Sequence, residues 1–301
     1  KCVLVDSDQK VLATATEALE VSRPAPTHSE QDPAHWWQAT LRGLDRLAAD
    51  APQAMAAVQG IGLSGQMHGA TLLDADDRVL RPCILWNDGR AAAECAEMEA
   101  AWPQLRAVTG NIAMPGFTAP KLLWVRKYEP DIFARTAKVL LPKAYLRLLL
   151  TGEYAEDMSD AAGTLWLDVA KRDWSNAALA TTGLSRRHMP RLVEGSAASG
   201  QLKSDLQRRW GMASAPIVAG GAGDNAAGAI SLGAVNPGDA FVSLGTSGVL
   251  WATTAGFAPN PRDAVHAFCH ALPQIWHQMG VILSAASCFA WLSDTLGQPE
   301  A

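Results

Sequence analysis

Ala215-Pro-Ile-Val-Ala-Gly-Gly-Ala-Gly-Asp-Asn-Ala-Ala-Gly-Ala-Ile-Ser231 is the stretch around which this sequence of 301 residues is organised. Its apolar run from Pro216 to Ala219 predicts a short buried strand, and the glycine-rich residues 220–223 predict a tight turn. Asp224 and Asn225 then precede small residues that are typical of a helix. Because Asp and Asn favour helix N-caps, a cap is the simplest role for Asp224. The alternative is a functional carboxylate beside glycines that let a ligand approach the backbone.

The next hairpin, Phe241-Val-Ser-Leu-Gly-Thr-Ser-Gly-Val-Leu-Trp251, favours the functional alternative. Its turn, Gly245-Thr-Ser-Gly248, lies between two apolar strand runs and directs backbone N–H groups and hydroxyls toward one point. Such a turn suits a phosphate group. A candidate base followed closely by a candidate phosphate cradle is typical of phosphoryl transfer.

Composition narrows the class of protein. With 49% hydrophobic and 18% charged residues the sequence is that of a globular protein, long enough for roughly two domains. The net charge of −5 and the lack of a basic tract argue against nucleic acid or a membrane surface as a partner. No apolar run approaches the roughly 20 residues of a membrane span. The five cysteines are scattered without metal-site spacing, which predicts buried free thiols in a reduced, cytoplasmic protein.

The order of predicted elements indicates α/β layers. Hairpins alternate with helices, and the hairpins near residues 1 and 245 are similar enough to suggest a duplicated fold. Asp32 and Pro33 predict the start of a helix, as cap and first helical residue. Residues 55–63 read as a strand that ends in Ser64-Gly-Gln-Met-His-Gly69.

Two further motifs lie at predicted strand ends. His68, in the glycine-flanked segment just named, suits a general base, a metal ligand or a polyol contact, although a single histidine is more often structural. Trp86-Asn-Asp-Gly-Arg90 combines an aromatic ring with an amide, a carboxylate and a guanidinium, a mixture that suits a sugar. The alternative is that Asp88 and Arg90 pair at a helix start, and this motif alone does not separate the two.

Together these motifs resemble the FGGY family of carbohydrate kinases, and within it the branch that phosphorylates the ketopentose D-xylulose. The resemblance extends from residue 1 to about residue 295. The segments that carry it are Gly65-Gln-Met-His-Gly69, Ile84-Leu-Trp-Asn-Asp-Gly-Arg90, Met114-Pro-Gly-Phe-Thr-Ala-Pro-Lys-Leu-Leu-Trp124, Leu141-Pro-Lys143, Tyr145-Leu-Arg147, Ser159-Asp-Ala-Ala-Gly-Thr164, Gly223-Asp-Asn-Ala-Ala-Gly228 and Ser243-Leu-Gly-Thr-Ser-Gly248.

The resemblance implies a ribonuclease-H-like, actin-like ATPase fold made of two duplicated domains, and it implies a role for each motif. Asp224 would be the catalytic base that accepts the proton of the sugar's 5-hydroxyl. The sugar pocket would be lined by Met67, His68, Trp86, Asp88 and Asn225. The β- and γ-phosphates of ATP would be held by Gly245, Thr246 and Ser247. Mg²⁺ would bridge the phosphates and take few protein ligands, so no metal cluster in the protein is expected.

The family pattern also implies domain boundaries. Residues 1–234 would form the sugar-binding domain and residues 235–301 the beginning of the nucleotide-binding domain. The family's first strand with its phosphate loop, and most of its second domain, have no counterpart here. We therefore expect a chain truncated at both ends and inactive alone. The segment Gly220-Gly-Ala-Gly-Asp224 also has one residue more than the Gly-Gly-Gly-Asp form, which predicts an altered turn.

Three functions follow as hypotheses. The first is a kinase that uses ATP and Mg²⁺ to phosphorylate D-xylulose, with a homodimer as one option for its assembly. The second is a kinase of the same family for another ketopentose or a polyol. The third is a non-catalytic sugar-binding or scaffold protein, which the presence of Asp224 disfavours.

Overall fold

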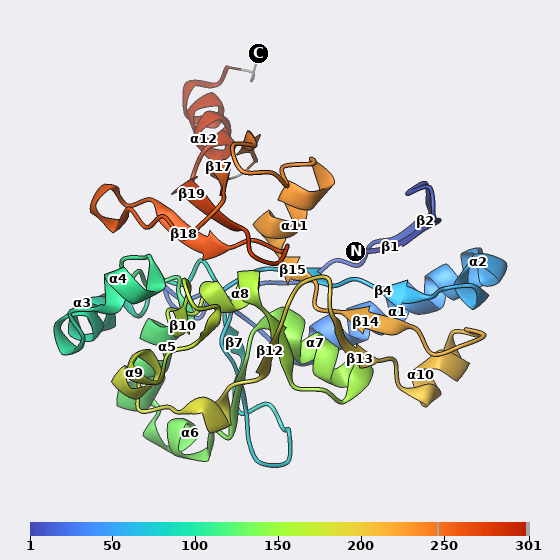
Figure 1. Cartoon of the computed structure of the whole chain (residues 1–301), viewed down its shortest axis with the longest axis horizontal. Coiled ribbons are helices and arrows are strands. Elements are labelled where there is room, and N and C mark those ends of the chain that lie inside the picture. Colours follow the sequence, from blue (N-terminus) through green and yellow to red (C-terminus); the bar gives the residue numbers. More distant parts are fainter. Residues whose placement is uncertain (246, 299–301) are drawn as a thin grey trace.

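The computed structural model describes residues 1–245 and 247–298. Most helices pack around short paired strands in residues 1–231, and the C-terminal strands form a separate sheet on one side (Figure 1). The strands before this sheet are β1 (Cys2–Val5), β2 (Val11–Ala15), β3 (Glu30–Gln31), β4 (Gly60–Ile61), β5 (Ser64–Gly65), β6 (Thr71–Leu73), β7 (Cys83–Ile84), β8 (Lys138–Leu140), β9 (Ala155–Asp157), β10 (Leu167–Asp168), β11 (Asp173–Trp174), β12 (Arg191–Val193), β13 (Ala198–Gln201), β14 (Ile217–Ala219) and β15 (Ala222–Gly223).

The helices cover these strands and share the buried apolar side chains with them. They are α1 (Pro33–Asp50), α2 (Pro52–Ala56), α3 (Ala92–Ala101), α4 (Leu105–Thr109), α5 (Thr118–Tyr128), α6 (Pro130–Arg135), α7 (Pro142–Thr151), α8 (Met158–Ala162), α9 (Asn176–Thr181), α10 (Ser204–Arg209), α11 (Asp224–Ser231) and α12 (Ala286–Leu296), with 3₁₀ turns η1 (Arg186–His188) and η2 (Pro261–Asp263).

Helix α1 begins as its sequence predicts. The Asp32 side chain accepts the Ala34 N–H at 2.9 Å, and Pro33 occupies the first turn, where a missing N–H costs nothing. The helix buries Trp36 and Leu47 against the strands. In contrast, the strand predicted over residues 55–63 is mostly wrong, because Pro52 starts the short helix α2 and only β4 remains extended.

A parallel pairing between distant segments positions the predicted site. β14 pairs with β4, and β15 pairs with β5, but the register advances by one residue between the two pairings. The extra residue forms a bulge at Gly220 and Gly221. A Cβ on Gly221 would meet the Leu63 carbonyl oxygen at 2.1 Å, and its φ of +71° also favours glycine. The altered turn predicted before Asp224 is therefore a β-bulge, a device common beside active sites.

The C-terminal sheet has the strand order β16 (Ala240–Leu244), β17 (Gly248–Thr254), β19 (Trp276–Ile282) and β18 (His266–Cys269), all antiparallel. The hairpin predicted around residue 245 is therefore confirmed. One face of the sheet buries Trp251 and Phe268 in the same apolar cluster as Leu72 and Leu122. The other face exposes large apolar side chains of β16 and β17, with Leu244 75% and Leu250 57% exposed.

Two further sequence expectations can be compared with the structure. All five cysteines are free, and Cys83, Cys95 and Cys269 are buried as expected, but Cys288 is exposed and Cys2 is half-buried. Among the described residues, no helix has both the length and the apolar composition needed to span a membrane.

Candidate functional site

A cleft of about 500 Å³ opens between the N-terminal elements and the C-terminal sheet. It brings together segments that lie up to 216 residues apart, from Met67 to Leu283. The predicted site residues that line it are Met67, His68, Trp86, Asp88, Asp224, Asn225, Gly245 and Ser247. Thr246, the remaining predicted residue, lies outside the described residues.

Asp224 stands at the start of α11, directly after β15. It is the first helical residue, whereas Gly223 is the N-cap, so the predicted capping role for Asp224 is wrong by one position. Asp224 Oδ1 accepts hydrogen bonds from the backbone N–H of Asn225 at 2.8 Å and from Asn225 Nδ2 at 3.1 Å. Oδ2 makes no hydrogen bond to any described residue and opens into the cleft.

The surroundings of Asp224 favour a base that can change its protonation state. Partial removal from water raises the pKa of this carboxyl above its usual range, although the hydrogen bonds from Asn225 oppose the shift. A raised pKa strengthens the carboxylate as a proton acceptor.

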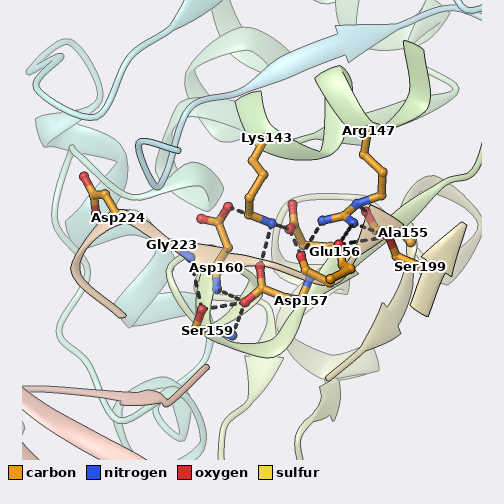
Figure 2. Close-up of polar contacts among 12 residues, drawn as sticks. Lys143, Arg147, Ala155, Glu156, Asp157, Ser159, Asp160, Ser199, Gly223 and Asp224 are labelled. Carbon is orange, nitrogen blue, oxygen red and sulfur yellow. Dashed lines mark hydrogen bonds and ion pairs between the residues drawn. The ribbon is translucent and has the colours of Figure 1, made fainter. Parts of the chain in front are cut away.

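A buried network holds the backbone in front of Asp224 (Figure 2). Ser159 Oγ accepts the Gly223 N–H at 3.1 Å and donates its own proton to Asp157 Oδ1. Asp157 in turn caps α8 by accepting the N–H of Ser159 and that of Asp160. The N-cap of α11 is thus tied to the N-cap of α8, which fixes where Asp224 enters the cleft.

Within the described residues, Glu156, Asp157 and Asp160 have carboxylate oxygens close enough together to hold a metal ion. However, the Lys143 ammonium already lies among them and forms ion pairs with all three (Figure 2). Burial and the neighbouring Glu156 raise the pKa of Asp160 well above its usual range. The cluster is therefore built around an internal cation rather than around a metal ion.

The Arg147 side chain also holds the bulge at Gly220 and Gly221 in place. Its guanidinium donates to the carbonyl oxygen of Ala219 at 2.6 Å and to that of Gly220, and it also contacts the Ser199 hydroxyl (Figure 2). Because an arginine presents several donors in one plane, it can satisfy carbonyls that a bulge leaves without ladder partners.

His68 adopts a strained backbone at the cleft wall. Its φ is +69°, which is uncommon for a residue other than glycine. The conformation is held by two hydrogen bonds to the His68 carbonyl oxygen, from Lys121 Nζ at 2.9 Å and from Thr118 Oγ1 at 3.1 Å. Lys121 is buried, and this burial lowers the pKa of its amine to about 7. Strain kept in place by such contacts is typical of functional sites.

The imidazole of His68 is fixed as one tautomer. Nδ1 lies 2.6 Å from the Gly163 carbonyl oxygen, which can only accept, so Nδ1 carries the proton. A Cβ on Gly163 would lie 2.7 Å from the His68 ring, so glycine is needed there. Burial lowers the pKa of His68 to about 3. His68 therefore offers the cleft a neutral Nε2 acceptor, which suits a hydroxyl.

Asp88 lines the cleft, but its carboxylate oxygens have little capacity left to accept further hydrogen bonds. Its carboxylate accepts the Ser29 N–H at 2.6 Å, the Arg90 backbone N–H at 2.9 Å and two guanidinium N–H groups of Arg90, at 2.7 and 2.9 Å. Burial raises its pKa, but the bonds from Arg90 and Ser29 outweigh this, and the pKa lies below its usual range. The structure thus contains the predicted alternative, an Asp88–Arg90 pair, whereas Trp86 stays partly exposed beside it.

The Gly-Thr-Ser-Gly turn joins β16 and β17 at the far wall of the cleft. The Gly245 N–H donates to the Ser247 carbonyl oxygen at 2.9 Å, and the Gly245 carbonyl accepts the N–H of Ala286, where α12 begins. Ser243, Gly245 and Ser247 line the cleft from this turn.

Sequence reasoning missed the contribution of the C-terminal sheet to the cleft. His266 and Phe268 of β18 line the cleft together with Val249 and Met279, and the Phe268 ring centroid lies 6.5 Å from that of His68. The alternation in Val265-His-Ala-Phe-Cys-His270 could have placed His266 and Phe268 on one face.

Comparison with known proteins agrees with this arrangement. Residues 1–231 match the N-terminal domain of the FGGY family of carbohydrate kinases. The chain belongs to this family. A xylulose kinase from Escherichia coli strain K12 is 58% identical over 297 residues, 99% of this chain, and one from Bacillus subtilis strain 168 is 37% identical over 301 residues. The chain spans 61% and 60% of the lengths of these relatives.

Solved structures establish the fold of this FGGY protein. The crystal structure of a xyloylose kinase from Brucella ovis superimposes with a TM-score of 0.96 at 60% identity, covering 98% of this chain and 61% of the other. Glycerol kinase from Plasmodium falciparum, at 18% identity, shares the fold with a TM-score of 0.89, covering 97% of this chain and 60% of the other. The predicted actin-like sugar-kinase fold is therefore confirmed.

Proposed function

We propose that the protein transfers the γ-phosphoryl group of ATP to the 5-hydroxyl of D-xylulose, with Asp224 as the catalytic base. One observation carries the proposal. Asp224 Oδ2 is free in a cleft whose walls hold His68 on one side and the turn of Gly245 and Ser247 on the other. The two most similar relatives cited above are named for xylulose, which supports the choice of sugar.

In the proposed reaction the sugar's 5-oxygen attacks the γ-phosphorus in line with the bond to the β–γ bridging oxygen. An O–P bond forms, the bridging bond breaks, and ADP leaves with the released electron pair. Asp224 accepts the hydroxyl proton as the O–P bond forms. Positioning and charge neutralisation account for most of the catalysis in such transfers, so the fixed entry of Asp224 through Gly223 and Ser159 supports the role.

The substrate-binding roles divide between the walls. Met67, His68, Trp86 and Asn225 would contact the sugar, and Gly245, Thr246 and Ser247 would hold phosphate oxygens. Asp88 would act mainly by keeping the loop after Trp86 in place, because its oxygens already accept four hydrogen bonds.

Mg²⁺ fits this site as a companion of the phosphates. When bound it would neutralise charge on the transferring group. Magnesium keeps several waters and needs few protein ligands, and the hydroxyls of Ser243 and Ser247 at the cleft wall are oxygen donors, the ligand type that it prefers. We also propose a domain boundary between residues 234 and 235, close to where the family match ends. A homodimeric assembly is part of the same proposal.

The test is a coupled ADP-release assay on the natural protein, including any sequence that flanks residues 1–301. We expect turnover with D-xylulose to exceed that with D-ribulose, L-ribulose and glycerol. Highest turnover with another sugar would replace the substrate, whereas sugar binding without ADP release from any of them would favour a non-catalytic binder.

A further inference from the structure

We propose that His266, on β18 of the C-terminal sheet, is a sugar-binding residue that accepts a hydrogen bond from a substrate hydroxyl through Nε2. The inference rests on the proposed sugar-kinase function and adds a contact from the C-terminal sheet. It is carried by the geometry that fixes the His266 ring.

The first step concerns the tautomer. His266 Nδ1 lies 2.9 Å from Asn111 Oδ1. The Asn111 amide cannot be reversed, because its Nδ2 donates to the carbonyl oxygens of Thr109 at 2.8 Å and Ala267 at 3.0 Å. Oδ1 is therefore an acceptor, and it also accepts the Ala267 N–H at 3.3 Å. His266 Nδ1 must carry the proton, which leaves a lone pair on Nε2.

The second step concerns access. His266 Nε2 makes no hydrogen bond to any described residue, and it is not among the buried polar atoms that lack a partner. Because the side chain lines the cleft, this nitrogen is open to a ligand there. The same holds for Nε2 of His68, which comes from the N-terminal elements.

The third step concerns ring placement. The Phe117 ring lies between the two imidazoles, with centroids 4.7 Å from His68 and 5.6 Å from His266, both edge-on. His266 also stacks on Phe268 at 5.5 Å. The histidine rings therefore cannot turn freely, and two fixed acceptors flank one aromatic surface.

The fourth step selects the ligand class. Burial lowers the pKa of His266 to about 4, so the ring is neutral at neutral pH. A neutral nitrogen lone pair accepts from hydroxyls and repels phosphate oxygens, which are also acceptors. The chemistry is therefore that of a sugar and not of a nucleotide phosphate.

The contact has a structural consequence. His68 belongs to the N-terminal elements and His266 to the C-terminal sheet, so one bound sugar would join both walls. Sugar affinity would then depend on the position of the C-terminal sheet, which also carries the turn of Gly245 and Ser247.

The experiment measures D-xylulose affinity by calorimetry in the natural protein without nucleotide. We expect His266→Phe, which keeps an aromatic ring on Phe268 but removes the acceptor, to weaken binding about tenfold. His266→Gln, whose amide oxygen can accept, should recover part of the loss. His270→Phe is the matched control, because it removes a buried imidazole just beyond β18 that does not line the cleft, and its sugar affinity should stay unchanged.

A second measurement keeps the wild-type chain and varies the ligand. Among deoxy analogues of D-xylulose, one should lose affinity in wild type yet bind wild type and His266→Phe equally, since both lack the same hydrogen bond. Additive losses for every analogue, or unchanged affinity in His266→Phe, would overturn this inference alone. Absence of any sugar binding by wild type would overturn the proposed function together with it.

Discussion

Asp88 and Asp224 line the same cleft, but their surroundings make them opposites. The Asp88 side chain is 0% exposed and accepts four hydrogen bonds, and its pKa lies below the usual range. Asp224 is exposed, bonds only to its neighbour Asn225, and has a raised pKa. This comparison indicates that a carboxylate beside a binding site is available for chemistry only where the fold leaves one of its oxygens without a hydrogen-bond donor.

The partners that separate the two residues are distant in sequence. Ser29, which donates to Asp88, is 59 positions away, and Ser159, which holds the backbone before Asp224, is 64 positions from Gly223. The comparison can therefore be tested by changing each carboxylate and its surroundings.

The largest effect is expected for Asp224→Asn. An amide cannot accept the hydroxyl proton, so turnover should fall by about 10³-fold, within the range typical of a lost general base. D-xylulose affinity should change little, because the shape of the side chain is kept. Coupled ADP release and calorimetry measure the two quantities, with Asp76→Asn in an exposed turn as the control. Turnover near the wild-type value would refute the base assignment.

Asp88→Asn should damage stability instead. It leaves the Arg90 guanidinium, 2% exposed, without its main partner, which typically costs about 3 kcal/mol of unfolding free energy. Glu30 still pairs with Arg90 at 2.7 Å and limits the loss.

Urea unfolding measures this change, and Asp76→Asn should alter the free energy of unfolding by less than about 0.5 kcal/mol. A variant of Asp88 as stable as wild type but with lost sugar affinity would instead make Asp88 a direct substrate contact.

As the pH is lowered, Asp224 should be protonated at a higher pH than Asp88. Because the pKa of Asp224 is raised, the rate should fall, up to tenfold per pH unit, from a pH above the usual aspartate value of about 3.9. The Asp88 pKa is lowered on folding, so its contribution to stability is complete above about 3.9 and is lost only as the pH falls below that value.

Activity should thus fall at a higher pH than the difference in unfolding free energy between wild type and Asp88→Asn, which isolates the Asp88 contribution from that of buried neutral histidines such as His68. The fall in activity and the loss of stability are measured as profiles of kcat/KM and of unfolding free energy against pH. If activity and stability fell over the same pH range, acid unfolding, and not protonation of Asp224, would limit the rate.

The smallest effect is expected at His68, which lies in the N-terminal elements. His68→Ala removes one neutral acceptor, so KM for D-xylulose should rise about tenfold. ATP hydrolysis without sugar should change less, since His68 lies opposite the turn of Gly245 and Ser247. An unchanged KM would count against the contact.

Much of the site could be predicted from the sequence because its motifs are local. Strand-end motifs gave the correct neighbourhood for His68, Trp86, Asp224 and Ser247, which all line one cleft. The hairpin around residue 245 followed from alternation and glycine. Local patterns also misled. The sequence suggested Asp224 as the N-cap, but the helix starts one residue earlier than expected, so that Gly223 is the N-cap and Asp224 the first helical residue.

The rest depends on contacts between distant segments. Nothing near Asp88 in sequence reveals the Ser29 donor, and nothing near Lys143 reveals the three buried carboxylates around it. His266 was missed for the same reason, because its tautomer is set by Asn111, 155 positions away. Propensity and motif spacing describe neighbours in sequence, whereas hydrogen-bond saturation is a property of the folded whole.

The parallel pairing of β4–β5 with β14–β15 has a consequence for folding. The two segments are separated by the whole of α3–α10, so their contact closes a very long loop and should form slowly. During synthesis the pairing must wait until residue 223 has left the ribosome, and Asp224 is placed only then. Pulse-labelled hydrogen exchange during refolding should show protection at 60–65 and 217–223 appearing together, later than in α1. Asp224 would then be among the last residues to reach its native position.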